Sequence, residues 1–223
     1  IGGLMVLRTA LAKENPDALS LAHVGAGIFA PRRDDDPDLE VNPMIPLREA
    51  YEASGGRFRI HSEPVELAPG VWLTGPVPRK HAERNWSGDR RILDGVSLVE
   101  DNLPEDTSLV LVTDEGLVVV SGCGHAGIVN TAEYAAEIAG HDSLHALIGG
   151  FHLFNATDKT LTWTGRRLEA LGIEHLHGGH CTGIEAVFQL RESAGLERRS
   201  AVVCAVGSSF ELGKGINPLP LAR

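Results

Sequence analysis

The stretch Leu117-Val-Val-Val-Ser-Gly-Cys-Gly-His-Ala-Gly127 decides the fold class, because an apolar run ends here at a glycine-rich turn. A run so rich in β-branched residues is typical of a strand that is buried on both faces. Residues 128–139 then place small apolar side chains at helical spacing, with Gly140 as a stop signal. The sequence therefore predicts a strand followed by a helix, with Cys123 and His125 at the carboxyl end of the strand.

Two later apolar runs end in the same way. Residues 145–152 close on Gly-Gly-Phe-His, and residues 173–181 close on Gly-Gly-His-Cys. Ligands of α/β folds gather where parallel strands end, so His152 and His180 are expected beside His125. If these histidines bind one or two metal ions such as zinc, metal–nitrogen distances near 2 Å would place the imidazoles of His125 and His180 roughly 4–7 Å apart.

Composition limits the kind of protein. With 223 residues, 43% of them hydrophobic, the chain can bury a full core and is expected to form one domain over 1–223. A formal charge of −10 argues against a nucleic-acid-binding surface, and no apolar run approaches the roughly 20 residues that span a bilayer. Three cysteines cannot all pair, which favours a reducing compartment, the cytoplasm. No pattern predicts an oligomeric state.

The other periodic segments predict hairpins in the front half of the chain and alternating helices and strands in the back half. The expected helices are 4–13, 47–54, 128–139, 157–171 and 184–194, and the expected strands are 18–24, 57–61, 65–67, 71–74, 108–113, 117–122, 144–149, 173–178 and 201–206. Thr157 is expected to cap its helix. Residues 25–42 carry consecutive charges and are expected to form a solvated loop. This alternation predicts sheets covered by helices.

Residues 75–106 interrupt this pattern with prolines, charges and isolated apolar residues. The basic residues of the segment are Arg79, Lys80, Arg84, Arg90 and Arg91. Irregular loops of this length are often functional, so we expect a mobile lid or insertion whose arginines bind the phosphate or carboxylate of a small anionic substrate near His125 and His180. A solvated surface excursion remains open as the alternative.

Three hypotheses apply to the turn at 122–127. Its Gly-x-Gly-x-x-Gly pattern could bind a dinucleotide, but Asp142 precedes the next strand, whereas the acidic residue of such sites follows it. The glycines could instead make a tight turn with hydrogen-bonded histidines. The third hypothesis is a metal site, because imidazole and thiolate suit zinc and similar cations.

The motifs Ser121-Gly-Cys-Gly-His-Ala-Gly-Ile-Val-Asn130, Ile148-Gly-Gly-Phe-His-Leu153 and Gly179-His-Cys-Thr-Gly183 together resemble the metallo-β-lactamase superfamily. The match is closest to its branch named after 7,8-dihydropterin-6-methyl-4-(β-D-ribofuranosyl)aminobenzene 5′-phosphate synthase. Residues 74–79 are similar to a middle motif of that branch. Residues 1–4 resemble the segment that follows its H-x-H-x-D-H signature, which predicts that the chain is the C-terminal portion of the domain.

The resemblance implies an α/β fold, an αβ/βα sandwich of two mixed sheets flanked by helices, which would be N-terminally incomplete here. It implies one or two ions of zinc or another divalent metal. The implied ligands are His125, His180 and Cys123, the last where many relatives place a bridging aspartate, with His152 as a conditional ligand or substrate contact. H-x-H-x-D-H, with its water-orienting aspartate, is absent from these 223 residues, so the chain alone is expected to bind metal weakly and to be inactive.

The function implied by the resemblance is that of a metal-dependent hydrolase or synthase-like enzyme. Metal-activated water would act on an ester-like or phosphate-containing small molecule, and the narrower expectation is a pterin-related condensation. The alternative from another class is a non-catalytic protein that keeps the fold, binds a small anion and has lost the metal site. A nicotinamide-dependent enzyme is the third and weakest hypothesis.

Overall fold

The computed structural model describes residues 2–86 and 88–219. The chain divides into two compact units, one of Ile1–Ser62 with Ser87–Glu105 and a larger one of Glu63–Trp86 with Asp106–Arg223. Each unit has its own sheets and its own buried residues. That residues 1–223 act as one domain stays a prediction.

The larger unit is built on a seven-stranded mixed sheet with the order β12-β11-β10-β9-β8-β5-β4. Its strands are β4 (Val65–Ala68), β5 (Val71–Leu73), β8 (Ser108–Thr113), β9 (Gly116–Ser121), β10 (Leu144–Gly149), β11 (His175–Gly178) and β12 (Ala201–Val203). Strands β9 to β12 are mutually parallel, whereas β4, β5, β8 and β9 pair antiparallel in succession. The carboxyl ends of β9, β10 and β11 therefore meet at one edge of the sheet.

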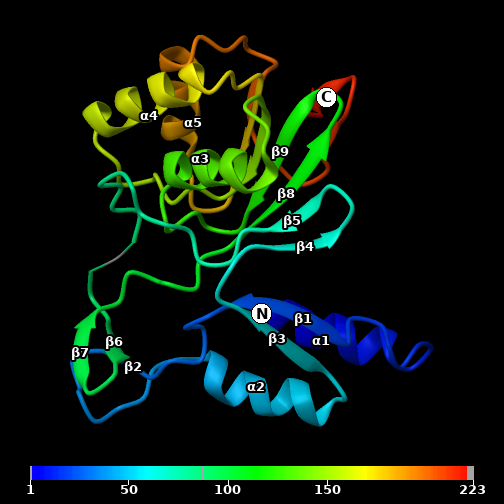
Figure 1. Ribbon diagram of the computed structural model, residues 1–223, viewed down its shortest axis with the longest axis vertical. Helices are drawn as coiled ribbons and strands as arrows, with labels where there is room; N and C mark the ends of the chain where they lie inside the picture. Colours follow the sequence, from blue (N-terminus) through cyan, green and yellow to red (C-terminus); the bar gives the residue numbers. More distant parts are fainter. Residues whose placement is uncertain (1, 87, 220–223) are drawn as a thin grey trace. The chain divides into compact units, whose positions relative to one another are not determined.

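Three helices connect the parallel strands. They are α3 (Ile128–Ala139), α4 (Asp158–Ala170) and α5 (Ile184–Ser193), and right-handed connections place all three on the same face of the sheet, as Figure 1 shows. Val119, Leu147 and Leu176 point from neighbouring strands into the core beneath these helices and are fully buried. The predicted α/β fold with a sheet flanked by helices is confirmed.

Several ends of these elements agree with the sequence signals. Helix α3 spans the predicted 128–139 and stops at Gly140, which adopts the left-handed conformation with φ 60°. Thr157 caps α4, since its hydroxyl oxygen accepts a hydrogen bond from the backbone N–H of Thr160. The sequence analysis missed a small antiparallel hairpin, β13 (Ser209–Glu211) with β14 (Gly215–Asn217).

The smaller unit contains two short helices and two small sheets. Its elements are α1 (Gly2–Leu11), β1 (Leu21–Gly25), β2 (Arg32–Arg33), α2 (Met44–Ala53), β3 (Arg57–His61), β6 (Arg91–Asp94) and β7 (Ser97–Glu100). Strands β1 and β3 pair parallel, and β2, β6 and β7 form an antiparallel sheet. Tyr51 of α2 is buried against Phe58 of β3, and its hydroxyl donates to the carbonyl of Leu19 at 2.6 Å.

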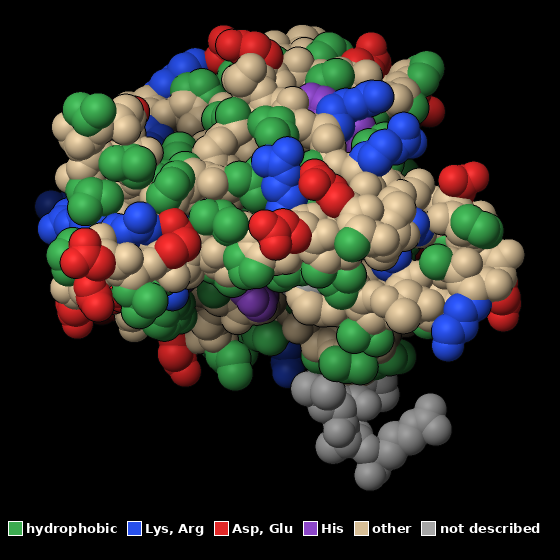
Figure 2. Space-filling view, turned by 90° about the horizontal axis from the view of Figure 1, so that it is seen from below, with side chains coloured by type: hydrophobic (Ala, Val, Ile, Leu, Met, Phe, Trp, Pro, Cys, Tyr) green, Lys and Arg blue, Asp and Glu red, His purple; other side chains and the backbone are tan. Residues whose placement is uncertain are grey.

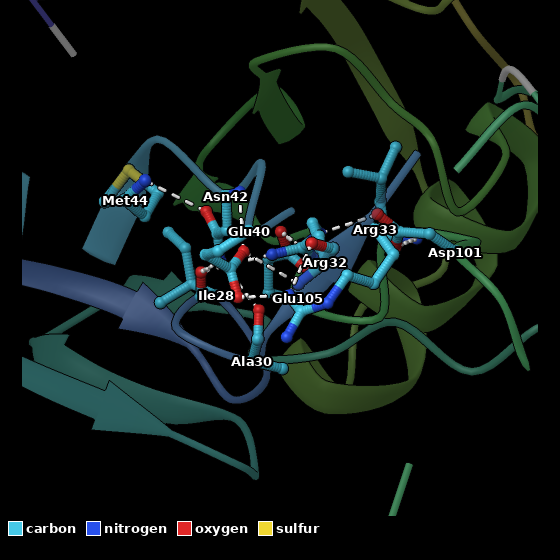
Figure 3. Close-up of polar contacts among 10 residues, drawn as sticks. Ile28, Ala30, Arg32, Arg33, Glu40, Asn42, Met44, Asp101 and Glu105 are labelled. Atoms are coloured by element: carbon cyan, nitrogen blue, oxygen red, sulfur yellow. Dashed lines mark hydrogen bonds and ion pairs between the residues drawn. The ribbon is translucent and has the colours of Figure 1, made fainter. Parts of the chain in front are cut away.

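The expectation of a solvated loop over 25–42 is wrong at Arg32. Its side chain is only 4% exposed, because its guanidinium donates to Asp101 at 2.6 Å and to both carboxylate oxygens of Glu105 at 2.7 Å (Figure 3). The backbone N–H of Arg32 also donates to Glu40 at 3.0 Å. One residue of the charged run is thus part of the polar interior of this unit, while the aspartates that follow it are exposed. Local sequence could not indicate this, because the two acidic partners lie 69 and 73 positions away.

The expectation of one irregular segment over 75–106 is also wrong. Residues 75–86 belong to the larger unit, while 88–105 belong to the smaller unit and include the β6–β7 hairpin. Alternation in β6 and β7 is hard to recognise because most of their side chains are exposed and only Ile92 is buried.

Acidic and basic side chains are interspersed on the face that Figure 2 shows. Many of them form ion pairs, such as Lys80 with Glu137 at 2.6 Å and Arg33 with Glu40 at 2.6 Å. Among the residues that the structure describes, no helix has the length and apolar content needed to cross a bilayer.

Candidate metal site

The predicted ligands follow three adjacent parallel strands. Cys123 and His125 come after β9, His152 after β10, and His180 after β11. Gly149, with φ 122°, lets the ends of β9 and β10 approach closely, because any Cβ there would collide with the carbonyl oxygen of Ser121. The glycines of the motif thus bring the strand ends together.

Cys123 and His180 meet at this edge although 57 positions separate them. The Sγ atom of Cys123 lies 3.3 Å from Nδ1 of His180. Cys181 completes a group in which one donor atom from each residue lies within 4.8 Å of the others. Its thiol also donates to the carbonyl of Cys123 at 3.5 Å. Two sulfur atoms and one imidazole nitrogen therefore converge from two strand ends.

His125 and His152 form the second half of the site. Their ring centroids are 4.4 Å apart. Nδ1 of His125 donates to the carbonyl of Asn85 at 2.7 Å, which leaves Nε2 with the lone pair that a metal needs. Nδ1 of His152 is buried and has no hydrogen-bond partner. An orphaned imidazole nitrogen beside other donor atoms fits a site that is completed by a cation.

His152 and His180 both adopt left-handed backbone conformations, with φ 45° and 51°. Residues other than glycine rarely adopt this backbone conformation, because it costs them about 1 kcal/mol or more. When they do, they are often at functional sites. The backbone thus holds both rings at this edge against a local preference.

Burial shapes the charge of the site. It lowers the pKa of His152, and the nearby His125 and His180 lower it further, so the ring is neutral at pH 7 and able to ligate. Burial, with Cys181 and Asp106 nearby, raises the pKa of the Cys123 thiol to about 12. Asp106 is partly buried, and the desolvation of its carboxyl raises its pKa; the carboxylate accepts the backbone N–H of Ala126 at 2.9 Å.

The helix N-terminus that follows the glycine turn is already filled by a carboxylate. Glu83 accepts the backbone N–H groups of Val129 at 3.2 Å and Asn130 at 2.8 Å, and it lies against Gly127. A dinucleotide would place its pyrophosphate at this position. The dinucleotide hypothesis is therefore incompatible with the structure.

Replacing Glu83 by Gln is expected to change how stability depends on pH. Burial raises the pKa of Glu83 above its ordinary value of 4.5, so its contribution is largest below pH 4.5 and is lost as pH rises through the raised pKa. The free energy of unfolding of the parent minus that of the variant should fall over this range, by about 1.4 kcal/mol for each unit of pKa shift. Urea unfolding at several pH values measures it.

The matched control for that experiment is Glu137→Gln, which removes an exposed carboxylate of α3, the helix whose N-terminus Glu83 caps. At each pH, the free energy of unfolding of this variant should differ from that of the parent by no more than about 0.5 kcal/mol. Parallel curves for the parent and the Glu83 variant would contradict the assignment of a buried, raised carboxyl.

The structure divides the four predicted substrate-binding arginines between the two units. Arg79 donates to the carbonyl of His125 at 2.6 Å, and both Arg79 and Arg84 lie over the ring of Trp86 at 4.8 and 5.1 Å. Arg90 lines a cavity of about 500 Å³ within the smaller unit. Arg91 lies in β6, opposite Arg33 of β2. The part of the segment that reaches His125 is thus Arg79 to Trp86.

Three residues of this site lie outside the set of ligands and substrate contacts expected from the sequence. Cys181 is one of them, and its place beside His180 is the sequence signal that indicates it. Asn85 and Asp106 carry no local signal, because their partners, the imidazole of His125 and the backbone N–H of Ala126, lie 40 and 20 positions along the chain.

Comparisons with known proteins agree with this architecture. No protein-family model matches the chain. The chain is 32% identical over 190 residues to a curated 7,8-dihydropterin-6-methyl-4-(β-D-ribofuranosyl)-aminobenzene-5′-phosphate synthase from Methanocaldococcus jannaschii, covering 83% of this chain and 63% of that protein. A crystal structure of a metal-dependent hydrolase of the β-lactamase superfamily matches with a TM-score of 0.64 and 24% identity, covering 78% of this chain and 64% of the other.

The chain thus shares the fold of a solved structure of the β-lactamase superfamily, and its sequence is similar to that of the pterin synthase whose branch the strand-end motifs resemble. The solved structure shares the fold, and the curated relative is an enzyme. The chain spans a little under two thirds of the length of the curated relative.

Proposed function

We propose that the chain carries part of the metal-dependent site of an enzyme that condenses a dihydropterin with a ribosyl-aminobenzene phosphate. The observation that carries this proposal is the convergence of Cys123, His180 and Cys181 at the strand end that also bears the neighbouring rings of His125 and His152. The name of the curated relative supplies the substrate class.

The donor set fits a divalent metal, with zinc as the first candidate. Thiolate and imidazole are the ligands that zinc prefers, and His152 offers a buried nitrogen without a partner. Cys123, Cys181, His125, His152 and His180 are the residues that would hold one or two ions. When bound, such an ion polarises the group under attack or lowers the pKa of a water molecule.

The surrounding residues have positioning roles in this proposal. The carbonyl of Asn85 fixes the tautomer of His125, and the guanidinium of Arg79 holds the backbone of His125 in place. Arg84 is exposed and, like Arg79, lies over the ring of Trp86. We therefore propose Arg84 as a contact for the phosphate of the substrate.

The test is product formation by the protein that carries this chain, loaded with Zn²⁺. It is incubated with 4-(β-D-ribofuranosyl)aminobenzene 5′-phosphate and a dihydropterin activated at its 6-methyl carbon. Mass spectrometry should detect the joined product, which Cys123→Ser should abolish and Cys204→Ser should leave unchanged, because Cys204 is an exposed thiol outside the cluster. Equal product from both variants, or none from the parent, would contradict the proposal.

Hydrolysis of a phosphate-containing or ester-like molecule is the second candidate, because the solved structure with this fold is that of a metal-dependent hydrolase. Release of phosphate or alcohol without a joined product, sensitive to Cys123→Ser, would support this candidate over the condensation. The small anionic substrate, without nucleic acid or membrane partners, and the cytoplasmic location remain proposals, the latter supported by three free cysteines.

A further inference from the structure

A second cluster of metal-binding side chains lies at the opposite end of the same parallel strands. His145 is the second residue of β10, His175 is the first residue of β11, and Glu174 directly precedes His175. One donor atom from each of the three residues lies within 4.8 Å of the others. The strand-end site occupies the carboxyl ends of these strands, so the two clusters are separate within the larger unit.

A β-bulge places His145 in this cluster. The parallel register between β9 and β10 pairs Leu144 with Leu117 and then Ala146 with Val118, so His145 is the extra residue. Bulges re-aim one side chain and are frequent beside functional sites. The ring of His145 is 4% exposed, which is unusual for a polar side chain unless its nitrogens are satisfied.

The distances in the cluster suit a tetrahedral ion. Nδ1 of His145 lies 3.0 Å from a carboxylate oxygen of Glu174. Two ligands that each lie 2.0–2.1 Å from zinc in tetrahedral geometry are about 3.3 Å apart. The ring of His175 lies edge-on to that of His145, with centroids 5.0 Å apart. The two groups are thus nearly at the spacing that a shared ion requires.

The other nitrogen of His145 lies next to a carboxylate at ion-pair distance, without hydrogen-bond geometry. Nε2 lies 2.9 Å from a carboxylate oxygen of Glu115, in the turn before β9. The backbone N–H of Gly213 donates to the same carboxylate at 3.1 Å. Carboxylates in this position orient the ring of a zinc ligand and strengthen its bond to the metal.

The β13–β14 hairpin shields the cluster. The ring of Phe210 lies 5.8 Å from that of His145 and 5.5 Å from that of His175. Gly215 has no side chain to exclude the imidazole of His175, which a Cβ there would approach to 2.8 Å. Nδ1 of His175 is buried and has no hydrogen-bond partner. An orphaned nitrogen next to a paired imidazole and carboxylate is a second observation that points to a cation.

We propose that His145, Glu174 and His175 form a second, structural site for Zn²⁺ or a similar borderline divalent cation, with Glu115 as the partner of His145. A bound ion would hold together three parts of the larger unit: the turn before β9, the amino ends of β10 and β11, and the β13–β14 hairpin. The competing explanation is a protonated His145 that forms ion pairs with Glu115 and Glu174 and binds no metal. The proposal is independent of the function of the strand-end site.

The ligand chemistry of the two sites allows them to be measured separately with Co²⁺. Only the strand-end site contains thiols, so Cys123→Ser/Cys181→Ser should remove the thiolate-to-cobalt charge-transfer band. The visible bands of tetrahedral Co²⁺ should remain in this double variant, in which the strand-end site keeps only its histidines. Adding His175→Ala should lower these bands, and the part that is lost reports the second site. The same change should lower the bound Zn²⁺ by one equivalent, measured by elemental analysis after dialysis.

Two further variants keep the test decisive. Glu174→Gln, at a side chain that is 58% exposed, should also lose this equivalent without endangering the fold. His141→Ala, just before β10, should retain it, because His141 is not part of the cluster. Circular dichroism checks that each variant is folded. Absence of Co²⁺ binding by the double cysteine variant, or unchanged binding in both His175→Ala and Glu174→Gln, would overturn the proposal in favour of the ion-paired imidazolium.

Discussion

Replacing His180 by Ala is expected to weaken Zn²⁺ binding at the strand-end site by more than about 100-fold and to abolish turnover. Nδ1 of His180 lies 3.3 Å from the sulfur of Cys123, and His180 belongs to the group of three donor residues that converge at that edge. Loss of an outer partner of a ligand already costs about 10–100-fold in metal affinity, and loss of the ligand should cost more. Competition with a chromophoric chelator measures the affinity, and product formation measures the turnover.

A glycine at the same position separates function from folding. The backbone of His180 has φ 51°, which glycine adopts without the penalty that other residues incur. His180→Gly should therefore unfold at no lower urea concentration than the parent, yet lose metal affinity as His180→Ala does. His141→Ala should keep parental affinity at this site. Retention of metal by His180→Gly would show that His180 is only a backbone feature and would remove it from the ligand set.

Replacing Arg32 by Ala is expected to destabilise the smaller unit by about 3–5 kcal/mol. The guanidinium is buried between Asp101 and Glu105, whose side chains are 3% and 14% exposed. Its removal leaves two buried carboxylates without a cation, which is the costly way to break a buried ion pair. Hydrogen exchange of amides in β2, β6 and β7 reports the free energy of opening this unit.

The neighbouring Arg33 provides a matched control for Arg32. It pairs with Glu40, but the two side chains are 22% and 33% exposed, so Arg33→Ala should cost no more than about 1 kcal/mol. Burial already raises the pKa of Glu105, so protonation at acid pH should relieve the unpaired charge in the Arg32 variant. The loss should thus shrink as pH falls. Equal losses in the two variants, constant with pH, would contradict a buried ionic network.

Much of the larger unit could be predicted because its signals are local. The apolar run before Cys123 defines β9, the small residues after Gly127 define α3, and Gly140 ends it. Hydrophobic periodicity and turn residues act over a few positions, so a single sequence carries them. The smaller unit was harder, since β6 and β7 expose most of their residues and Arg32 is indistinguishable in sequence from a solvated charge.

The candidate site also has a part that local sequence signals predict and a part that depends on distant residues. The sequence by itself determined that Cys123, His125, His152 and His180 follow successive strands, because strand ends are local features and parallel order brings them to one edge.

Only the tertiary structure decided which donor atoms meet, because contacts between residues about 20 to 60 positions apart depend on how loops pack. It pairs the thiol of Cys181 with that of Cys123, sets the tautomer of His125 through Asn85, and joins the carboxylate of Asp106 to the backbone N–H of Ala126. It also reveals His145, whose role depends on a one-residue bulge that no periodicity in the sequence encodes.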